Sequence, residues 1–456
     1  MMDTARSFPR VVIGAAGSGA GKTTVVCAVL RALQNRGLRP ASFKCGPDYI
    51  DPMFHTEVLG VPSRNLDLFF FSRETARALF AKNAAGRDIS VIEGVMGFYD
   101  GIGSTDRAST SDLANQLDAP AVLVMDCAGM GLSAAAVARG FLSFRKNQIR
   151  GLILNRLKPM GYSYYKELLE RETGIPVLGY LPPMPECSLE SRHLGLVTAG
   201  EVHDLREKLD RLACQAEKSI DLDALIRFAR TAPEMEPAPP APQYLFAEPV
   251  RIGIARDAAF QFYYEDALDL LRSLGADLVP FSPLADPSLP ENLQGLLLGG
   301  GYPELHTQEL SGNKRMLEEI SREIRAGMPC VAECGGFQYL QESLEGVDGK
   351  EYPMAGVLPG RARRTPRLVR FGYVNLRARQ DNLLCGRGEG FPAHEFHYWD
   401  STENGNTFTA GKPSGKSWDC CFSSGTLYAG YPHFHFCACP QAARRFLRKA
   451  HEYGRG

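Results

Sequence analysis

The chain has 456 residues, 44% of them hydrophobic and 23% charged, a composition typical of a soluble globular protein with more than one domain. Its 51 basic and 52 acidic side chains leave a net charge of −1, which gives no electrostatic basis for binding nucleic acid or an anionic membrane. The sequence shows no bilayer-spanning segment, no signal peptide and no zinc-type spacing among its 12 cysteines. We therefore expect a cytoplasmic protein with reduced thiols.

A phosphate-binding loop is predicted near the N-terminus. A β-branched run at 11–13 leads into Gly14-Ala-Ala-Gly-Ser-Gly-Ala-Gly-Lys-Thr-Thr24, and an apolar helical pattern follows over 25–33. Glycines let backbone N–H groups turn toward phosphate, and the helix N-terminus adds positive potential. The strict motif has glycine where this chain has Ala16, which predicts a variant of the loop. The residues predicted to bind ATP are Gly17, Gly19, Gly21, Lys22, Thr23 and Thr24, with the Thr23 hydroxyl also on Mg²⁺.

Acidic residues follow two predicted strands of the first half. The strand 41–45 leads into a turn with Asp48, whose carboxylate could reach a metal beside Thr23. Gly-Pro-Asp is also an ordinary turn sequence, and by itself it does not indicate a metal ligand. The strand 88–93 ends at Glu93 and runs into glycine, where α/β nucleotide enzymes place a metal-facing carboxylate. Because an unpaired carboxylate is costly to bury, Glu93 is predicted to face the site rather than the core.

Strands and helices alternate through the rest of the first half. Helices are predicted over 72–85, 132–144 and 162–171, and strands over 121–126, 151–155 and 175–181. This alternation predicts a doubly wound, mostly parallel sheet whose ligands lie beyond the carboxyl ends of its strands. The proline-rich stretch 231–249 predicts a linker between a domain at 1–230 and a second domain at 250–456.

The second domain contains a candidate nucleophile. Strands are predicted over 251–255, 276–280 and 295–299, and helices over 265–274 and 313–326. Cys334 lies at a sharp strand-to-helix junction, so its thiol is exposed and the Gly335 N–H is aligned as an oxyanion donor. A second donor is expected from the glycines at 299–301. The late histidines His433 and His435 are candidate bases.

A pair of histidines and a cluster of arginines in the second domain give less specific indications of function. His394 and His397 have the spacing of a metal site, but strand alternation places them on opposite faces, so a metal is not expected there. Five arginines between 361 and 370 form a basic cluster, which is usually a solvated face but would suit the docking of a polycarboxylate.

Taken together, these motifs resemble the cobyrinate a,c-diamide synthases of cobalamin biosynthesis over nearly the whole chain. Besides the phosphate loop, the resemblance is carried by Phe43-Lys-Cys-Gly-Pro-Asp-Tyr-Ile-Asp-Pro52, Arg64-Asn-Leu-Asp67, Val91-Ile-Glu-Gly-Val-Met-Gly-Phe-Tyr-Asp-Gly101, Arg192-His-Leu-Gly-Leu196, Ala255-Arg-Asp-x-Ala-Phe-x-Phe-Tyr-Tyr264, Gly300-Gly-Tyr-Pro-Glu304, Ala332-Glu-Cys-Gly-Gly336 and His394-Glu-Phe-His-Tyr398.

The resemblance implies a dethiobiotin-synthetase-like P-loop ATPase domain joined to a class I glutamine amidotransferase domain, each an α/β domain with a doubly wound, mostly parallel sheet. The implied reaction converts the a and c acetate side chains of cobyrinate to carboxamides, with ATP, Mg²⁺ and L-glutamine as ammonia donor. A carboxylate is a poor electrophile, so we expect ATP to convert it to an acyl phosphate, and we expect the ammonia to pass to it inside the protein.

The resemblance also implies roles for individual residues. Cys334 is the implied nucleophile and His433 its base, with His435 as the alternative. The oxyanion donors are Gly300 and Gly335; the metal residues are Thr23, Asp48 and Glu93; the substrate-side residues are Tyr49, Asp51 and Asp100. The usual triad has a glutamate two residues after the histidine, where this chain has His435. Either a Cys–His dyad or an acid from elsewhere, such as Glu395, must orient His433.

The sequence is also compatible with other functions. Hydrogenobyrinate, nickel-sirohydrochlorin or the b, d, e and g carboxyls amidated by cobyric acid synthase would need nearly the same machinery. The order of the domains and the Glu-Cys-Gly-Gly elbow favour the a,c enzyme. A ParA-like ATPase switch gives Cys334 no role, and such switches carry a lysine where this chain has Gly17. A homodimer is compatible with the sequence.

Overall fold

The structure is a computed structural model that describes residues 6–188, 199–240 and 242–455. The first five residues of the N-terminus and the motif Arg192-His-Leu-Gly-Leu196 lie outside the described residues. The chain divides into two compact units, Met1–Pro239 and Pro240–Gly456, and their boundary falls inside the proline-rich stretch. Within the described ranges, none of the helices combines the length and apolarity needed to cross a membrane. The cytoplasmic location stays a prediction.

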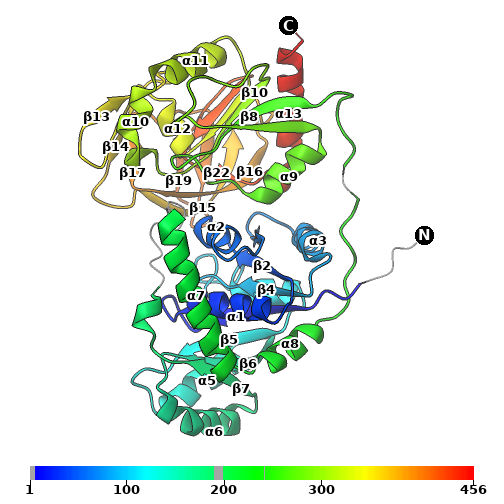
Figure 1. Ribbon diagram of the computed structural model, residues 1–456. Coiled ribbons are helices and arrows are strands. Elements are labelled where there is room, and N and C mark those ends of the chain that lie inside the picture. Colours follow the sequence, from blue (N-terminus) through cyan, green and yellow to red (C-terminus); the bar gives the residue numbers. More distant parts are fainter. Residues whose placement is uncertain (1–5, 189–198, 241, 456) are drawn as a thin grey trace. The chain divides into compact units, whose positions relative to one another are not determined.

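A seven-stranded sheet forms the centre of the first unit, in the order β3-β2-β4-β1-β5-β6-β7, and its strand pairs are parallel (Figure 1). Its strands are β1 (Arg10–Ala15), β2 (Pro40–Cys45), β3 (Ser63–Leu66), β4 (Ile89–Glu93), β5 (Ala121–Asp126), β6 (Ile149–Asn155) and β7 (Val177–Leu181). Its helices are α1 (Lys22–Asn35), α2 (Ile50–Glu57), α3 (Arg73–Ala84), α4 (Thr110–Gln116), α5 (Ser133–Ser143), α6 (Tyr162–Thr173), α7 (Ala199–Ser219) and α8 (Leu222–Arg230).

Helices cover both faces of this sheet. Val11 and Ile13 of β1 pack in one apolar cluster with α1, α2, α7 and α8, while Val12 packs in a second cluster with α3 to α6. Because both faces are buried, the strands read as nearly continuous apolar runs. The predicted doubly wound sheet is confirmed. Helices α7 and α8 were not predicted, since the sequence analysis assigned no element after the prolines at 182–185.

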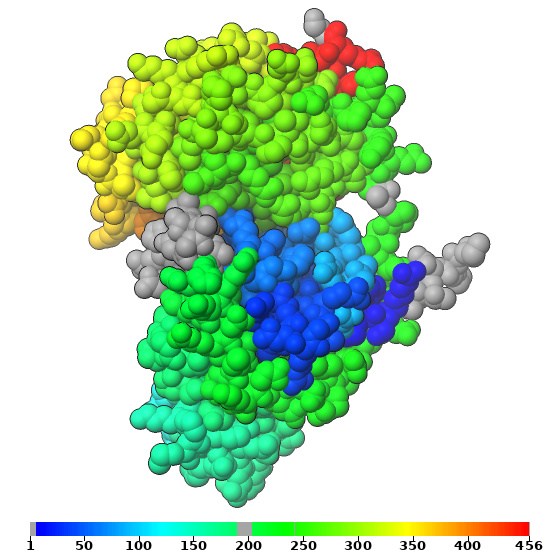
Figure 2. All heavy atoms as spheres, in the orientation of Figure 1, coloured from blue at the N-terminus to red at the C-terminus, as the bar shows by residue number. Residues whose placement is uncertain are grey.

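The second unit also has a mostly parallel sheet, in the order β20-β21-β11-β10-β8-β9, of which only the β20–β21 pair is antiparallel. Two more sheets were not predicted: one with the order β13-β12-β14-β17 and an antiparallel one with the order β19-β18-β15-β16-β22. In Figure 2 the face of this unit turned to the viewer is built mainly by its earlier residues, coloured green to yellow.

The strands of this unit are β8 (Val250–Ala255), β9 (Ala276–Phe281), β10 (Gly295–Leu298), β11 (Cys330–Glu333), β12 (Ser343–Glu345), β13 (Glu351–Pro353), β14 (Arg361–Arg364), β15 (Arg370–Ala378), β16 (Gly390–His397), β17 (Trp399–Ser401), β18 (Phe408–Gly411), β19 (Ser417–Cys420), β20 (Phe422–Ser423), β21 (Leu427–Gly430) and β22 (His433–Phe434). Its α-helices are α9 (Glu265–Ser273), α10 (Thr307–Gly312), α11 (Lys314–Arg325), α12 (Gly335–Tyr339) and α13 (Pro440–Tyr453).

Candidate functional site

The predicted phosphate loop connects β1 to α1. Gly19 and Gly21 have positive φ angles of 76° and 82°, and a Cβ on Gly21 would lie 2.0 Å from Asn155 Nδ2. Both glycines are therefore required by the backbone, whereas Ala16 is tolerated. At the start of α1, Lys22 Nζ donates a hydrogen bond to the Met96 carbonyl at 2.8 Å. Burial and the nearby charge of Lys44 lower the pKa of Lys22.

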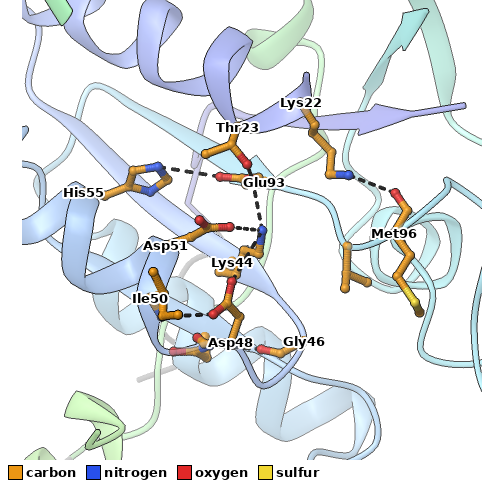
Figure 3. A network of polar contacts seen from close by, with 12 residues as sticks. Lys22, Thr23, Lys44, Gly46, Asp48, Ile50, Asp51, His55, Glu93 and Met96 are labelled. Carbon is orange, nitrogen blue, oxygen red and sulfur yellow. Dashed lines mark hydrogen bonds and ion pairs between the residues drawn. The ribbon is translucent and has the colours of Figure 1, made fainter. Parts of the chain in front are cut away.

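A second lysine lies at the centre of the carboxylates that the sequence analysis singled out (Figure 3). Lys44 of β2 is 5% exposed, and its Nζ donates to Asp51 Oδ2 and, at 2.9 Å, to Glu93 Oε1. Asp48 Oδ2 lies 4.0 Å from the same nitrogen. Burial by itself would lower the pKa of Lys44, but Glu93 and Asp51 outweigh it and raise this pKa. Lys44 is part of one of the motifs that carry the family resemblance, but no role was predicted for it from the sequence.

Glu93 is completely buried, so the prediction that it avoids the core is wrong. The expectation assumed an unpaired carboxylate, whereas Glu93 Oε1 accepts hydrogen bonds from Thr23 Oγ1 at 2.7 Å and from Lys44. Its Oε2 has no hydrogen-bond partner among the described residues and lies 3.5 Å from His55 Nε2. Burial, and then Asp51, raise the pKa of Glu93. This carboxylate therefore keeps one buried oxygen available beside Thr23.

The remaining predicted acids of this unit have different surroundings. Asp51 lies in the first turn of α2, and Lys44 outweighs the effect of burial and lowers the pKa of Asp51 to about 2. Burial and Asp51 raise the pKa of Asp48 to about 7. Tyr49 is the residue that directly precedes α2. Asp100 is exposed and accepts a hydrogen bond from Gly97 N at 2.8 Å, which stabilises its own loop.

A pocket of about 440 Å³ adjoins the phosphate loop, and the sequence analysis did not predict it. Its lining includes Gly21, Thr24, Asn155, Arg156 and the proline-rich segment 182–185. Asn155 Nδ2 donates to the Ala20 carbonyl at 2.8 Å, and Arg156 donates to the Gly19 carbonyl at 2.7 Å. The available signal was polar residues at the carboxyl end of β6, where α/β folds bind ligands.

In the second unit, Cys334 forms a sharp elbow between β11 and α12, with φ 47° and ψ −99°. The prediction that this elbow exposes the thiol is wrong, because Cys334 is only 7% exposed in the packed elbow. A Cβ on Gly336 would lie 2.1 Å from the Leu298 carbonyl, and one on Gly335 would lie 3.2 Å from Gly301 N. Glycine is thus required where the elbow packs against the loop 299–301. A Cβ on Gly300 would lie 2.5 Å from His433 Cε1. The elbow, the glycine loop and His433 are therefore brought together.

The structure also gives His433 an acidic partner. His433 Nδ1 lies 3.1 Å from Oε2 of Glu333, the residue directly before Cys334. Burial lowers the pKa of His433 to about 4, and burial raises the pKa of both Glu333 and Cys334. At neutral pH the thiol and the imidazole are consequently both uncharged, and the imidazole is able to accept a proton. Sequence reasoning missed Glu333, although it stands in the quoted Glu-Cys-Gly-Gly motif.

The alternatives proposed from the sequence, His435 and Glu395, have other hydrogen-bond partners in the structure. His435 is 1% exposed, accepts a hydrogen bond from Cys437 N at 3.1 Å and stacks on Tyr264 with ring centroids 4.8 Å apart. This geometry favours a structural role for His435. Glu395 Oε2 lies 3.3 Å from His397 Nε2. Among the described residues, no group of three or more His, Cys, Asp or Glu is arranged to hold a metal ion.

The basic cluster of β14 and β15 divides into surface pairs and one partly buried member. Arg363 pairs with Glu351 at 2.6 Å, and Arg361 lies 3.7 Å from the same side chain. Arg370 stacks over Trp418 at 5.0 Å and lies 4.0 Å from Glu395 Oε2. The cluster is therefore mostly a solvated face with internal ion pairs.

Comparison with protein families agrees with this division. Residues 11–197 match the CobQ/CobB/MinD/ParA nucleotide binding domain, and residues 251–440 match the CobB/CobQ-like glutamine amidotransferase domain. The fold and the two matches define the class: a nucleotide-binding domain and a glutamine amidotransferase domain on one chain, as in ligases that use glutamine as nitrogen donor.

Whole-chain relatives define the family within this class. The chain is 39% identical to the cobyrinate a,c-diamide synthase of Caldanaerobacter subterraneus over 96% of its own length and 97% of the relative's. It is 39% identical to that of Thermoplasma volcanium over 98% of both, and 41% identical to that of Listeria monocytogenes over 94% and 96%. The chain belongs to the family of cobyrinate a,c-diamide synthases, which are amidating ligases. The predicted family and class of enzyme are confirmed.

Proposed function

We propose that this protein amidates the a and c acetate carboxylates of cobyrinate, with ATP as the activating substrate and glutamine as the nitrogen donor. The observation that carries the proposal is the similarity to synthases of this name over nearly the whole chain. The two groups of side chains support it: one suits phosphate and carboxylate chemistry, and the other suits thiol chemistry. We assign the first to residues 1–230 and the second to 250–456, with 231–249 as their linker.

In the proposed ATP site, the loop from Gly17 to Thr24 surrounds the phosphates and Lys22 contacts the outer ones. Lys22 now donates to a backbone carbonyl, a neutral partner that a phosphate oxygen would readily replace. The pocket lined by Asn155 and Arg156 is the proposed place of the base and sugar. Lys44 would face the transferring phosphoryl group, where its charge stabilises the negative charge that develops on the oxygens.

Magnesium fits the donors present beside this loop. Mg²⁺ takes oxygen ligands, and in phosphoryl-transfer sites it is held by one or two protein groups together with substrate phosphates. Thr23 Oγ1 and Glu93 Oε1 are 2.7 Å apart, and Glu93 Oε2 is buried without a hydrogen-bond partner among the described residues. Thr23 and Glu93 would hold the ion, with Asp48 close by. When bound, it would neutralise phosphate charge as the acyl phosphate forms.

In the proposed glutaminase site, Cys334 attacks the γ-carboxamide of glutamine and His433 takes up the thiol proton. The N–H groups of Gly300 and Gly335 are the proposed oxyanion donors, and Glu333 holds the imidazole in position. The released ammonia passes to the acyl phosphate within the protein, and Tyr49, Asp51 and Asp100 are assigned to the side of the tetrapyrrole acid. A homodimer stays a prediction.

The substrate is tested by a turnover assay with purified protein, ATP, Mg²⁺ and glutamine against a panel of tetrapyrrole acids. We expect cobyrinate to gain two amidations, read by mass spectrometry as the mass change of two carboxyls converted to carboxamides. Preferential turnover of hydrogenobyrinate or nickel-sirohydrochlorin would contradict the proposed substrate but support the proposed amidation reaction. Amidation at more than two carboxyls would point to the b, d, e and g reactions, and ATP hydrolysis with no amidated product would favour the ATPase switch.

Replacing Glu333 by glutamine tests the acid of the proposed triad. Glu333→Gln keeps the side-chain size but removes the carboxylate that orients His433, so kcat for glutamine hydrolysis is expected to fall about 10²-fold or more. Amidation with added ammonia should continue at the wild-type rate, which shows that the variant is folded. The measurement is glutamate release under saturating glutamine. A kcat within about threefold of the wild type would leave a Cys–His dyad as the better description.

A further inference from the structure

Glu395 Oε1 is buried near Cys334 without a hydrogen-bond partner among the described residues, and the buried side chains of Gln338 and Tyr431, which contact each other, lie close by. Gln338 N donates to the Cys334 carbonyl at 2.9 Å, and Tyr431 packs edge-on against Phe337 with ring centroids 5.1 Å apart. Buried polar atoms nearly always have partners, so an orphaned carboxylate oxygen near a nucleophile indicates a missing ligand. A carboxylate oxygen only accepts hydrogen bonds, which favours a ligand with N–H donors.

Glu395 is the charged member of this group. It lies on β16, is 1% exposed, and is directed by strand alternation to the buried face that also carries His397. His397 in turn stacks on Tyr431 with ring centroids 3.8 Å apart. Glu395 also affects the reacting groups: burial and Glu304 raise the pKa of Cys334 most, and Glu333 and Glu395 add to this rise. The carboxylate therefore belongs to the surroundings of the thiol.

The hydrogen bonds of His397 show which oxygen of Glu395 is available. His397 Nδ1 lies 2.7 Å from the Trp399 carbonyl, which only accepts, so this nitrogen carries a proton. His397 Nε2 lies 3.3 Å from Glu395 Oε2. A hydrogen bond between these two atoms requires a second proton, because without one both of them are acceptors. Oε2 is thus engaged by His397, and Oε1 is the oxygen that faces a ligand.

We propose that Glu395 is a specificity-determining residue that binds the α-ammonium group of glutamine through Oε1. An ammonium group offers three N–H donors, and the buried Glu395 Oε1, which has no hydrogen-bond partner among the described residues, is a matching acceptor. Arg370 lies 4.0 Å from Glu395, so a cation and an anion of the protein stand side by side. This pair matches an α-amino acid, whose carboxylate Arg370 would bind. The inference rests on the proposed glutaminase function.

The test compares glutamine with glutaramate, which has the same γ-carboxamide and carboxylate but no α-ammonium group. Glu395→Gln is expected to raise KM for glutamine about 10- to 100-fold, the factor that a hydrogen bond to a charged group is worth, and to leave kcat within about threefold. KM for glutaramate should change little. The ratio of kcat/KM between the two substrates should therefore fall by the same 10- to 100-fold.

Two further variants sharpen this comparison. Arg370→Gln should weaken both substrates by the same factor, since both carry the carboxylate. Glu389→Gln alters an exposed carboxylate that pairs with Arg445, and it should leave the ratio unchanged. Ammonia-dependent amidation reports that each variant is folded.

The outcomes separate this inference from the function on which it rests. If the wild type hydrolyses glutamine and Glu395→Gln lowers kcat for both substrates without changing their ratio, Glu395 acts on His433 or on folding, and the inference is wrong. If the wild type hydrolyses neither substrate, the proposed glutaminase function fails and the inference fails with it.

Discussion

Replacing Cys334 by alanine is expected to abolish glutamine-dependent amidation and to leave ammonia-dependent amidation at the wild-type rate. Alanine removes the sulfur that forms the proposed γ-glutamyl thioester, and loss of a nucleophile of this kind costs a factor on the order of 10⁴ or more. The phosphate loop and its carboxylates belong to the other unit of the chain and are not altered. The measurement is product mass with saturating glutamine in one series and ammonium chloride in the other.

Cys330→Ala is the matched control for this experiment. Cys330 lies four residues earlier on β11 and is also buried, but it is outside the elbow. Its replacement removes one buried sulfur and should reduce stability by about 1 kcal/mol while sparing both activities. Equal loss of both activities in Cys334→Ala would contradict the two-site scheme. Retained glutamine-dependent turnover would contradict the assignment of Cys334 as nucleophile.

Elements governed by local rules could be predicted from the sequence. The strands at β1, β4 and β5 are apolar runs ended by glycine or an acid, and the sheet of the first unit buries them on both faces as that pattern requires. The elbow at Cys334 is another local feature, because a residue with positive φ followed by two glycines is set by short-range sterics. These features were predicted with their positions.

Features that depend on residues far apart in the chain could not be predicted in the same way. The pairing of Glu333 with His433 joins residues separated by 100 positions, and no spacing rule indicates it. In the sequence, Lys44 is a single polar residue within a predicted strand, and only the structure shows that Asp51 and Glu93 surround it. Glu93 was expected outside the core for the same reason, because its compensating partners come from other elements. The antiparallel sheet that carries Glu395 likewise combines strands from widely separated segments.

Replacing Lys44 by methionine is expected to lower amidation by about 10²- to 10³-fold with either nitrogen donor, because the proposed ATP site loses a cation that faces developing negative charge. The same change removes the partner of buried carboxylates, and breaking a buried ion pair of this kind costs about 3–5 kcal/mol of unfolding free energy. Both effects are measurable on one sample, by product mass with added ammonia and by thermal unfolding. Turnover with ammonia within a few-fold of the wild type would contradict the assignment.

The loss of stability in Lys44→Met should depend on pH. In the wild type, Lys44 outweighs burial and holds the pKa of Asp51 at about 2, below the ordinary value of 3.8, so this pair stabilises the folded state above pH 4 and progressively less as the pH falls toward 2. The pKa of Lys44 is raised, so its share of the stabilisation is complete below pH 10. The difference in Tm between wild type and variant should therefore be largest near neutral pH and shrink in acid. The control variant is Arg39→Met, which breaks an exposed ion pair with Asp88 and should change Tm little at any pH. An equal loss of Tm in both variants would show that the Lys44 cluster contributes no more to stability than a surface ion pair does.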